Sequence, residues 1–162
     1  MDELGFDYLK DAGHDLHAEI LVFPHHGGLS GGSATSLNRF AEELVRAVEP
    51  LDVVFSQDRR KFGNPRPEVV GAVRRAGPDV RIACTELAQA CAKDLNTDAP
   101  AHLLPLFAMG AERHSCCAGT MRIALAPDGD LQPARSVHRA FVERNAKTAL
   151  CLGRSSGGAV PS

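Results

Sequence analysis

Two adjacent histidines end a short apolar run near the start of the chain. The run Ile20-Leu21-Val22-Phe23-Pro24 leads into His25-His26, and two glycines then turn the chain. A neutral imidazole is a good ligand for zinc and similar transition metals, and the end of a strand fixes the direction in which it points. The pair therefore favours a metal site, with two partly exposed loop histidines as the alternative interpretation. Because a metal site needs three or more ligands, the remaining donors must come from elsewhere.

The five cysteines form a second group of residues that could do chemistry. One pair is spaced seven apart, two cysteines are adjacent beside a histidine, and the fifth stands near the end of the chain. One interpretation is a structural zinc site with the ligands Cys84, Cys91, Cys117 and Cys151. The other is a set of buried free thiols, which behave as small apolar side chains. No Cys-x-x-Cys pair is present, so the spacing leaves both open. A thiolate–imidazole pair of Cys116 or Cys117 with His114 is a weaker interpretation.

A basic loop is the third such group. Arg59-Arg60-Lys61 follows the apolar run 52–56, and Arg66 comes shortly afterwards. Loops at this edge of an α/β sheet commonly carry the binding site, and guanidinium groups bind phosphate well. Arg66 and Arg60 are therefore the candidate phosphate contacts, with a solvated surface loop as the alternative interpretation.

Hydrophobic patterning predicts the elements that position these residues. Residues 18–24, 52–56 and 80–84 are short apolar runs typical of buried strands. Apolar positions at helical spacing predict helices over 37–48 and 68–76, which end at Pro50 and Gly77. Alternating strands and helices with short connections predict right-handed crossovers and a mostly parallel sheet.

The rest of the chain predicts less regular structure. Residues 3–12 fit a short helix, 120–126 a strand, and 131–134 its partner across a turn at 127–130. Residues 137–145 fit a final helix. We expect one domain over residues 1–152, followed by a flexible tail over 153–162.

The first half of the sequence resembles the C-terminal half of the metallo-β-lactamase fold, in the branch of ComEC-like competence proteins and related hydrolases. The resemblance rests on three stretches in the same order and spacing. They are Ala18-Glu19-Ile20-Leu21-Val22-Phe23-Pro24-His25-His26-Gly27-Gly28, Glu49-Pro50-Leu51-Asp52-Val53-Val54-Phe55-Ser56 and Gly63-Asn64-Pro65-Arg66-Pro67-Glu68-Val69. It covers about half the chain, from Met1 to Thr85.

This resemblance implies half of an αββα sandwich, here with a cysteine-bearing, β-rich extension. Members of the family hold one or two metal ions, usually zinc, which activate a water for attack on phosphodiesters or other ester-like bonds. The late histidine ligand of the family corresponds to His26, or failing that to His25. The implied substrate is therefore a nucleic acid or a nucleotide.

The chain also departs from the family pattern. No His-x-His-x-Asp-His run, the main ligand cluster of the family, occurs in this sequence. Asn64 and Arg66 stand where relatives often carry histidines, so a metal role is lost there. We therefore expect no hydrolysis by this chain alone. One interpretation is the distal half of a longer or split enzyme, which a missing N-terminal half or an oligomer partner would complete. The other is a degenerate relative of the family. The alternative function is a non-catalytic interaction module derived from the same fold.

Composition and charge limit the classes of protein to which this chain could belong. The 162 residues are 44% hydrophobic and 23% charged, with a formal net charge of −2. A near-neutral chain has no general attraction to nucleic acid or anionic membrane, so any phosphate contact must be local. No apolar run approaches the roughly 20 residues that a membrane-spanning helix needs. The acidic N-terminus does not fit a signal peptide, so we expect a cytoplasmic protein without membrane association.

Overall fold

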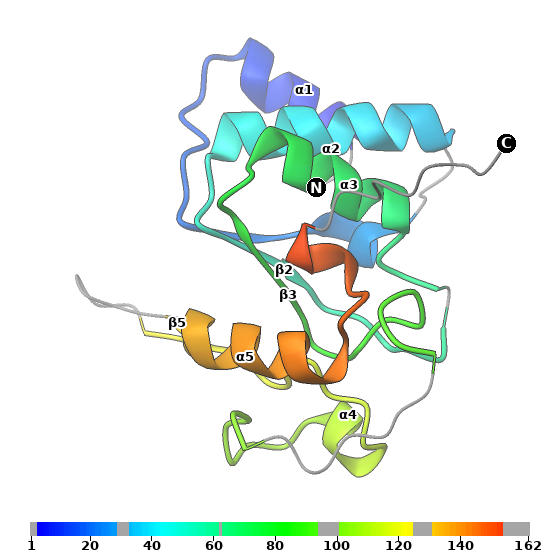
Figure 1. The fold of residues 1–162 in the computed structure, drawn as a ribbon. Coiled ribbons are helices and arrows are strands. Elements are labelled where there is room, and N and C mark those ends of the chain that lie inside the picture. The colour runs from blue at the N-terminus through cyan, green and yellow to red at the C-terminus, as the bar shows by residue number, and fades with distance from the viewer. Residues whose placement is uncertain (1–2, 29–32, 62, 94–100, 125–130, 154–162) are drawn as a thin grey trace, which may run out of the picture.

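A three-stranded parallel sheet forms the centre of the protein. The structure, a computed structural model, describes residues 3–28, 33–61, 63–93, 101–124 and 131–153. Strands β1 (Ile20–Val22), β2 (Asp52–Phe55) and β3 (Arg81–Cys84) lie in the order β1-β2-β3 (Figure 1). Both neighbours pair with β2 in parallel, with Val54 opposite Val22 and Phe55 opposite Cys84. The three predicted strands and their parallel arrangement are confirmed.

Two amphipathic helices cover one face of this sheet. They are α2 (Ala34–Val48) and α3 (Pro67–Ala76), which pack against each other as well as against the strands (Figure 1). Helix α2 begins three residues before the predicted start because the Ser33 hydroxyl accepts a hydrogen bond of 3.1 Å from the Ser36 N–H. Helix α3 begins at Pro67, where a missing N–H costs nothing. Both predicted helices are confirmed.

The core lies between these helices and the sheet. Apolar side chains one turn apart on each helix meet the strand residues that point to the same face. Those that are at most 2% exposed include Ala41, Leu44, Val45, Val53, Phe55, Val69 and Val73. Helix α1 (Glu3–Asp11) extends this core, since Phe6 packs edge-on against Phe40 with ring centroids 5.7 Å apart. Among the described residues, no helix combines the length and the apolar character needed to cross a membrane.

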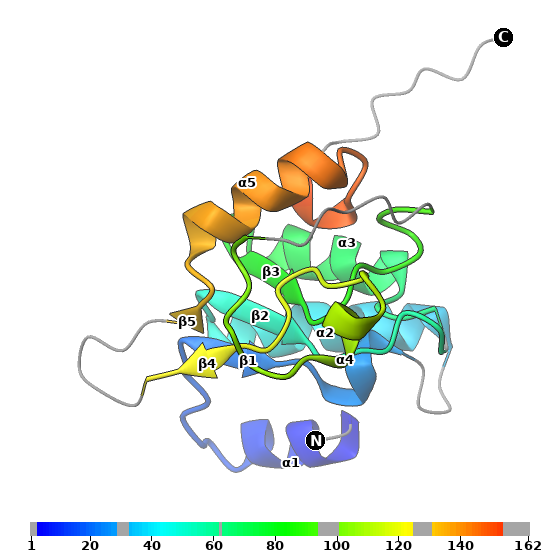
Figure 2. The same ribbon diagram turned by 90° about the horizontal axis from the view of Figure 1, so that it is seen from below.

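Most of the C-terminal third of the chain lies on the opposite side of the sheet from α2, whereas its last short helix contacts α3 and β3. It contains α4 (Met109–Glu112), β4 (Arg122–Ile123), β5 (Leu131–Gln132), α5 (Arg135–Asn145) and the short 3-10 helix η2 (Leu150–Leu152) (Figure 2). Strands β4 and β5 pair antiparallel, as predicted, although they are shorter than the sequence pattern indicates. Their predicted turn at 127–130 and the predicted tail beyond residue 153 lie outside the described residues. The protein is therefore a mixed α/β structure with a small parallel and a small antiparallel sheet.

One C-terminal segment is bonded to the chain at the end of β3. The Ala118 N–H donates to the Cys84 carbonyl at 2.8 Å, and the Leu87 N–H donates to the Ser115 carbonyl at 2.7 Å. Glu86 and Cys116 form an antiparallel bridge between these bonds. Backbone hydrogen bonds thus attach the region around Cys116 to the end of β3.

The turn after β1 packs very closely against β2. The 3-10 segment η1 (Pro24–Gly27) ends at Gly27, whose φ of +74° lies in the left-handed region. A Cβ atom on Gly27 would lie 2.7 Å from the Phe55 ring and 2.8 Å from the Pro65 side chain. Glycine is required here both for its backbone conformation and for the space it leaves.

Replacing Gly27 by alanine tests this close packing. We expect Gly27→Ala to lower the free energy of unfolding by about 2–4 kcal/mol, because backbone strain and overpacking add. Gly13→Ala is the matched control, since Gly13 has a φ of +72° but nothing within 4 Å of its Cβ position. It should cost only about 1 kcal/mol in urea denaturation. Equal losses for the two variants would show that the contact with Phe55 is unimportant.

Candidate functional site

A cleft of about 530 Å³ opens at the carboxyl edge of the parallel sheet. All three strands contribute to it through the residue or loop that follows them, which is the expected place for a site in an α/β sheet. His26 follows β1, Asp58 and its neighbours follow β2, and Glu86 follows β3. The complete lining is His26, Ser56, Gln57, Asp58, Arg60, Lys61, Asn64, Glu86, Met109 and Arg113.

The histidine pair adopts an unusual backbone conformation. His25 and His26 have φ values of 50° and 56°, both in the left-handed region that costs non-glycine residues roughly 1–2 kcal/mol each. Both side chains are exposed, and His26 lines the cleft. The backbone next to the pair is fixed, because the Arg66 N–H donates a hydrogen bond to the Gly27 carbonyl at 3.1 Å. Strained residues that the surrounding fold enforces are common at binding sites.

Asn64 fixes the other side of this turn. Its side chain is buried and lies against Gly28, where a Cβ atom would come within 2.7 Å of the Asn64 amide nitrogen. The glycine therefore allows the histidine turn to approach the loop before α3. This contact joins His26 and Asn64 on one wall of the cleft.

The three basic residues of the loop after β2 point in different directions. Arg60 and Lys61 are exposed and line the cleft. Arg59 is buried instead, and its guanidinium donates to the Leu87 carbonyl at 2.8 Å and to the Ala92 carbonyl at 2.6 Å. Arg66, a predicted phosphate contact, precedes α3 and is not part of the lining. Of the two predicted contacts, the structure brings only Arg60 into the cleft.

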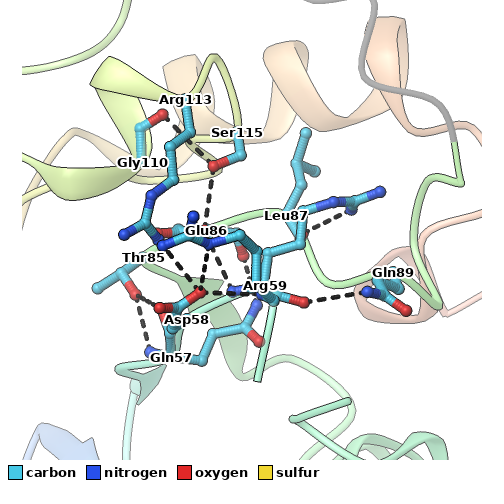
Figure 3. Close-up of polar contacts among 11 residues, drawn as sticks. Gln57, Asp58, Arg59, Thr85, Glu86, Leu87, Gln89, Gly110, Arg113 and Ser115 are labelled. Carbon is cyan, nitrogen blue, oxygen red and sulfur yellow. Dashed lines mark hydrogen bonds and ion pairs between the residues drawn. The ribbon is translucent and has the colours of Figure 1, made fainter. Parts of the chain in front are cut away.

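Glu86 is the buried carboxylate that connects the walls of the cleft (Figure 3). It is 4% exposed, and one oxygen accepts hydrogen bonds from the Arg59 N–H at 3.1 Å and from the Ser115 hydroxyl at 3.0 Å. Its other oxygen lies 3.4 Å from the Arg113 guanidinium. Gly110 leaves room for it, since a Cβ there would lie 2.8 Å from Glu86 Cγ. The carboxylate thereby fastens α4 to the loop after β2.

Asp58 carries a second carboxylate on the same wall. The N–H of Arg60 donates to it at 2.9 Å, and the Arg113 guanidinium lies 3.1 Å away. The backbone hydrogen bond from Arg60, assisted by Arg113, lowers the pKa of the Asp58 carboxyl below its ordinary value of 3.8, against a smaller opposing effect of desolvation. The carboxylate is therefore charged at neutral pH, and it holds the base of the loop that presents Arg60 and Lys61.

These donors do not make a complete metal site. His26 is the only imidazole in the lining, and both carboxylates are already engaged by Arg113 and by backbone N–H groups. Within the described part of the chain, no three His, Cys, Asp or Glu side chains are grouped so that they could hold a metal ion. A metal bound at His26 would need ligands from another segment, so we derive no catalytic step through one.

The sequence reasoning missed Asp58, Glu86 and Arg113. Glu86 had a usable signal, because it stands just after the third predicted strand, as His26 stands just after the first. Arg113 had none, since it reaches Glu86 from 27 residues away in a region of weak patterning.

The four cysteines that the sequence singled out lie elsewhere but lie together. Cys84, Cys91, Cys117 and Cys151 line one small apolar cavity behind β3, and Cys116 does not. The histidine 3.1 Å from the Cys117 sulfur is His138 of α5. All five cysteines are free thiols.

Comparison with known proteins finds no matching family model, no matching curated protein and no matching solved structure. The function must therefore be argued from the cleft and its residues.

Replacing Glu86 tests its role in the cleft. We expect Glu86→Gln to lower the free energy of unfolding by about 3 kcal/mol, because the bonds from Arg113 and the Arg59 N–H lose a buried charged acceptor. The control, Glu112→Gln, removes an exposed carboxylate from α4, the helix that Glu86 holds, and should change stability by less than about 0.5 kcal/mol. Similar urea midpoints for the two variants would contradict this role.

Proposed function

We propose that this chain is part of a metal-dependent hydrolase that acts on phosphodiesters such as nucleic acid or nucleotides, and that its share of the site is phosphate binding. One observation carries the proposal: His26 lies in the same cleft as Arg60 and Lys61, at the carboxyl edge of a parallel sheet. The resemblance of residues 1–85 to the distal half of the metallo-β-lactamase fold supports the hydrolase part.

Arg60 and Lys61 would bind the phosphate. A guanidinium can donate two parallel hydrogen bonds to phosphate oxygens, and an ammonium adds a mobile positive charge. Both side chains are exposed in the cleft, whereas the base of their loop is held by Asp58. Fixing the loop lowers the entropic cost of binding, because only the ends of the two side chains must become ordered.

His26 would be the contribution of this chain to the reacting centre. Its position is fixed by the strained turn, and its imidazole is exposed to the cleft. Zinc, the usual metal of the fold that the sequence resembles, would supply Lewis-acid activation when bound there with donors from another segment. The residues of this chain would orient the substrate and disfavour other binding orientations.

The sheet itself supports a larger assembly. Among the described residues, β1 pairs only with β2, and Val22 on β1 is 58% exposed. An apolar side chain on an edge strand is a usual contact for a further layer. This fits half of an αββα sandwich whose other half packs beside β1.

Phosphate binding can be measured on the chain alone. We expect the double variant Arg60→Ala/Lys61→Ala to bind a fluorescein-labelled single-stranded oligonucleotide about tenfold more weakly than the wild type, by anisotropy at fixed salt. The matched control, Arg39→Ala/Arg46→Ala, removes the same two charges from the outer face of α2 and should bind normally. Equal losses would reveal nonspecific attraction, and no loss in either would remove the cleft as the phosphate site.

Hydrolysis requires a completed site. We expect no cleavage of bis(4-nitrophenyl) phosphate by this chain alone, and zinc-dependent cleavage when a segment bearing a His-x-His-x-Asp-His run, encoded in frame or adjacent to this chain, is added. His26→Ala should abolish that cleavage, whereas His14→Ala, outside the cleft, should not. If no such mixture is active, the hydrolase proposal is wrong.

The exposed edge also favours a second candidate, a non-catalytic interaction module. It predicts that the chain self-associates through β1 and that the double variant His25→Ala/His26→Ala associates equally well. Sedimentation velocity at micromolar concentration measures this, and a monomer would exclude it.

A further inference from the structure

Four of the five cysteines converge from distant parts of the sequence. Cys84 ends β3, Cys91 follows it in a turn, Cys117 lies in the segment paired with β3, and Cys151 lies in η2. All four line one cavity between the sheet and α5. The fifth cysteine, Cys116, is equally buried but points elsewhere, against Gly110.

The cavity itself is small and apolar. Its volume is about 10 Å³, which is close to the space of a single water molecule. Water needs two to four polar partners to remain in such a place, and the other lining residues are apolar, with Leu87, Ala88 and Val142 among them. Four thiols around an atom-sized cavity suit a soft metal ion better than water.

Two guanidinium groups lie beside this cluster, of which Arg59 is buried and Arg74 is half-buried. Arg59 donates to the carbonyls of Leu87, Ala92 and Lys93, and Arg74 donates to those of Pro78, Val80 and Cys151. Neither guanidinium takes part in any ion pair formed among the described residues. The Nε of Arg74 is buried without a hydrogen-bond partner in the described structure.

Both cations lie next to the segments that carry the cysteines, since Arg74 donates to the Cys151 carbonyl and Arg59 donates to the Ala92 carbonyl beside Cys91. A buried cation that is bonded only to carbonyls is costly unless a negative charge lies near it. Negative charge on the cysteine cluster would therefore stabilise the buried Arg59, and it would also attract the half-buried Arg74.

We propose that Cys84, Cys91, Cys117 and Cys151 bind a structural zinc ion. Each cysteine loses its thiol proton to solvent, so one Zn²⁺ replaces four protons and the site carries a net charge of −2. Arg59 and Arg74 balance that charge from two sides. The sulfurs do not form a ready ligand shell as they stand, so binding draws them inward around the cavity.

His138 would support one of the ligands. Its Nε2 lies 3.1 Å from the Cys117 sulfur, and its side chain is 3% exposed. As a neutral imidazole protonated on Nε2, it would donate a hydrogen bond to the Cys117 thiolate. Such outer contacts orient metal ligands and strengthen binding.

A zinc ion at this site would strengthen the attachment of the C-terminal third to the sheet. Strands β4 and β5 are two residues each, and η2 has three residues. A zinc ion bound by β3, the segment at Cys117 and η2 would tie these short elements together, as structural zinc does in small domains. The inference is independent of the proposed function, because it uses none of the cleft residues.

The test measures metal in the full chain after expression with added zinc. We expect one zinc per chain by mass spectrometry, and on replacement by cobalt the sulfur-to-metal charge-transfer band of a four-thiolate site. Chelation should lower the melting temperature and expose four thiols to Ellman's reagent. Zinc affinity should rise with pH, since binding releases protons. Substoichiometric zinc in the wild type, with no cobalt–thiolate band, overturns the proposal even if every variant fails to fold.

Variants locate the site. Cys84→Ser and Cys117→Ser should reduce or abolish the cobalt band, whereas Cys116→Ser, the adjacent buried control, should keep it. His26→Ala should also keep it, which separates this site from the cleft. A band that weakens as much in Cys116→Ser as in Cys117→Ser, or that disappears in His26→Ala, would contradict the assignment.

Discussion

The parallel pairing of β2 on both of its edges is the constraint on which the rest of the structure depends. Val53 and Phe55 have no exposure on one face and Val54 is 6% exposed on the other, so the strand is covered on both faces and paired on both sides. Parallel pairing sends the ends of all three strands to the same edge. Side chains as distant in sequence as His26 and Glu86 therefore meet in one cleft, and no local feature of the sequence is needed to bring them together.

The sheet also determines which basic side chains are buried and which are exposed. The loop after β2 turns Arg59 inward to the carbonyls beyond β3 and leaves Arg60 exposed in the cleft. Glu86 makes this division stable, because it accepts the Arg59 N–H and holds Arg113 on the opposite wall. The exposed cations can bind an anionic ligand, whereas the buried Arg59 lies beside the cysteines. One loop thus connects the proposed phosphate-binding cleft with the proposed zinc site.

Much of this was predictable from the sequence, and the limit has a physical origin. Short apolar runs and helical spacing predicted β1, β2, β3, α2 and α3, because burial on a sheet or along one helix face leaves a direct trace in the sequence. The sequence offered Cys84, Cys91, Cys117 and Cys151 as one possible group, and these four do line one cavity, but residue type alone did not separate them from Cys116. The interactions of Glu86 did not, since they join residues 27 to 29 positions apart. The inward turn of Arg59 was equally hidden, because Arg60 beside it has the same side-chain type.

The central claim is that the carboxyl-edge cleft binds a phosphodiester. Amide chemical shifts recorded during titration with a thymidine dinucleotide test it most directly, because they report every residue at once. The account predicts saturable shifts confined to the cleft, at His26, Arg60, Lys61 and Asn64. Shifts restricted to residues outside the cleft, or no saturable shifts at millimolar ligand, would contradict it.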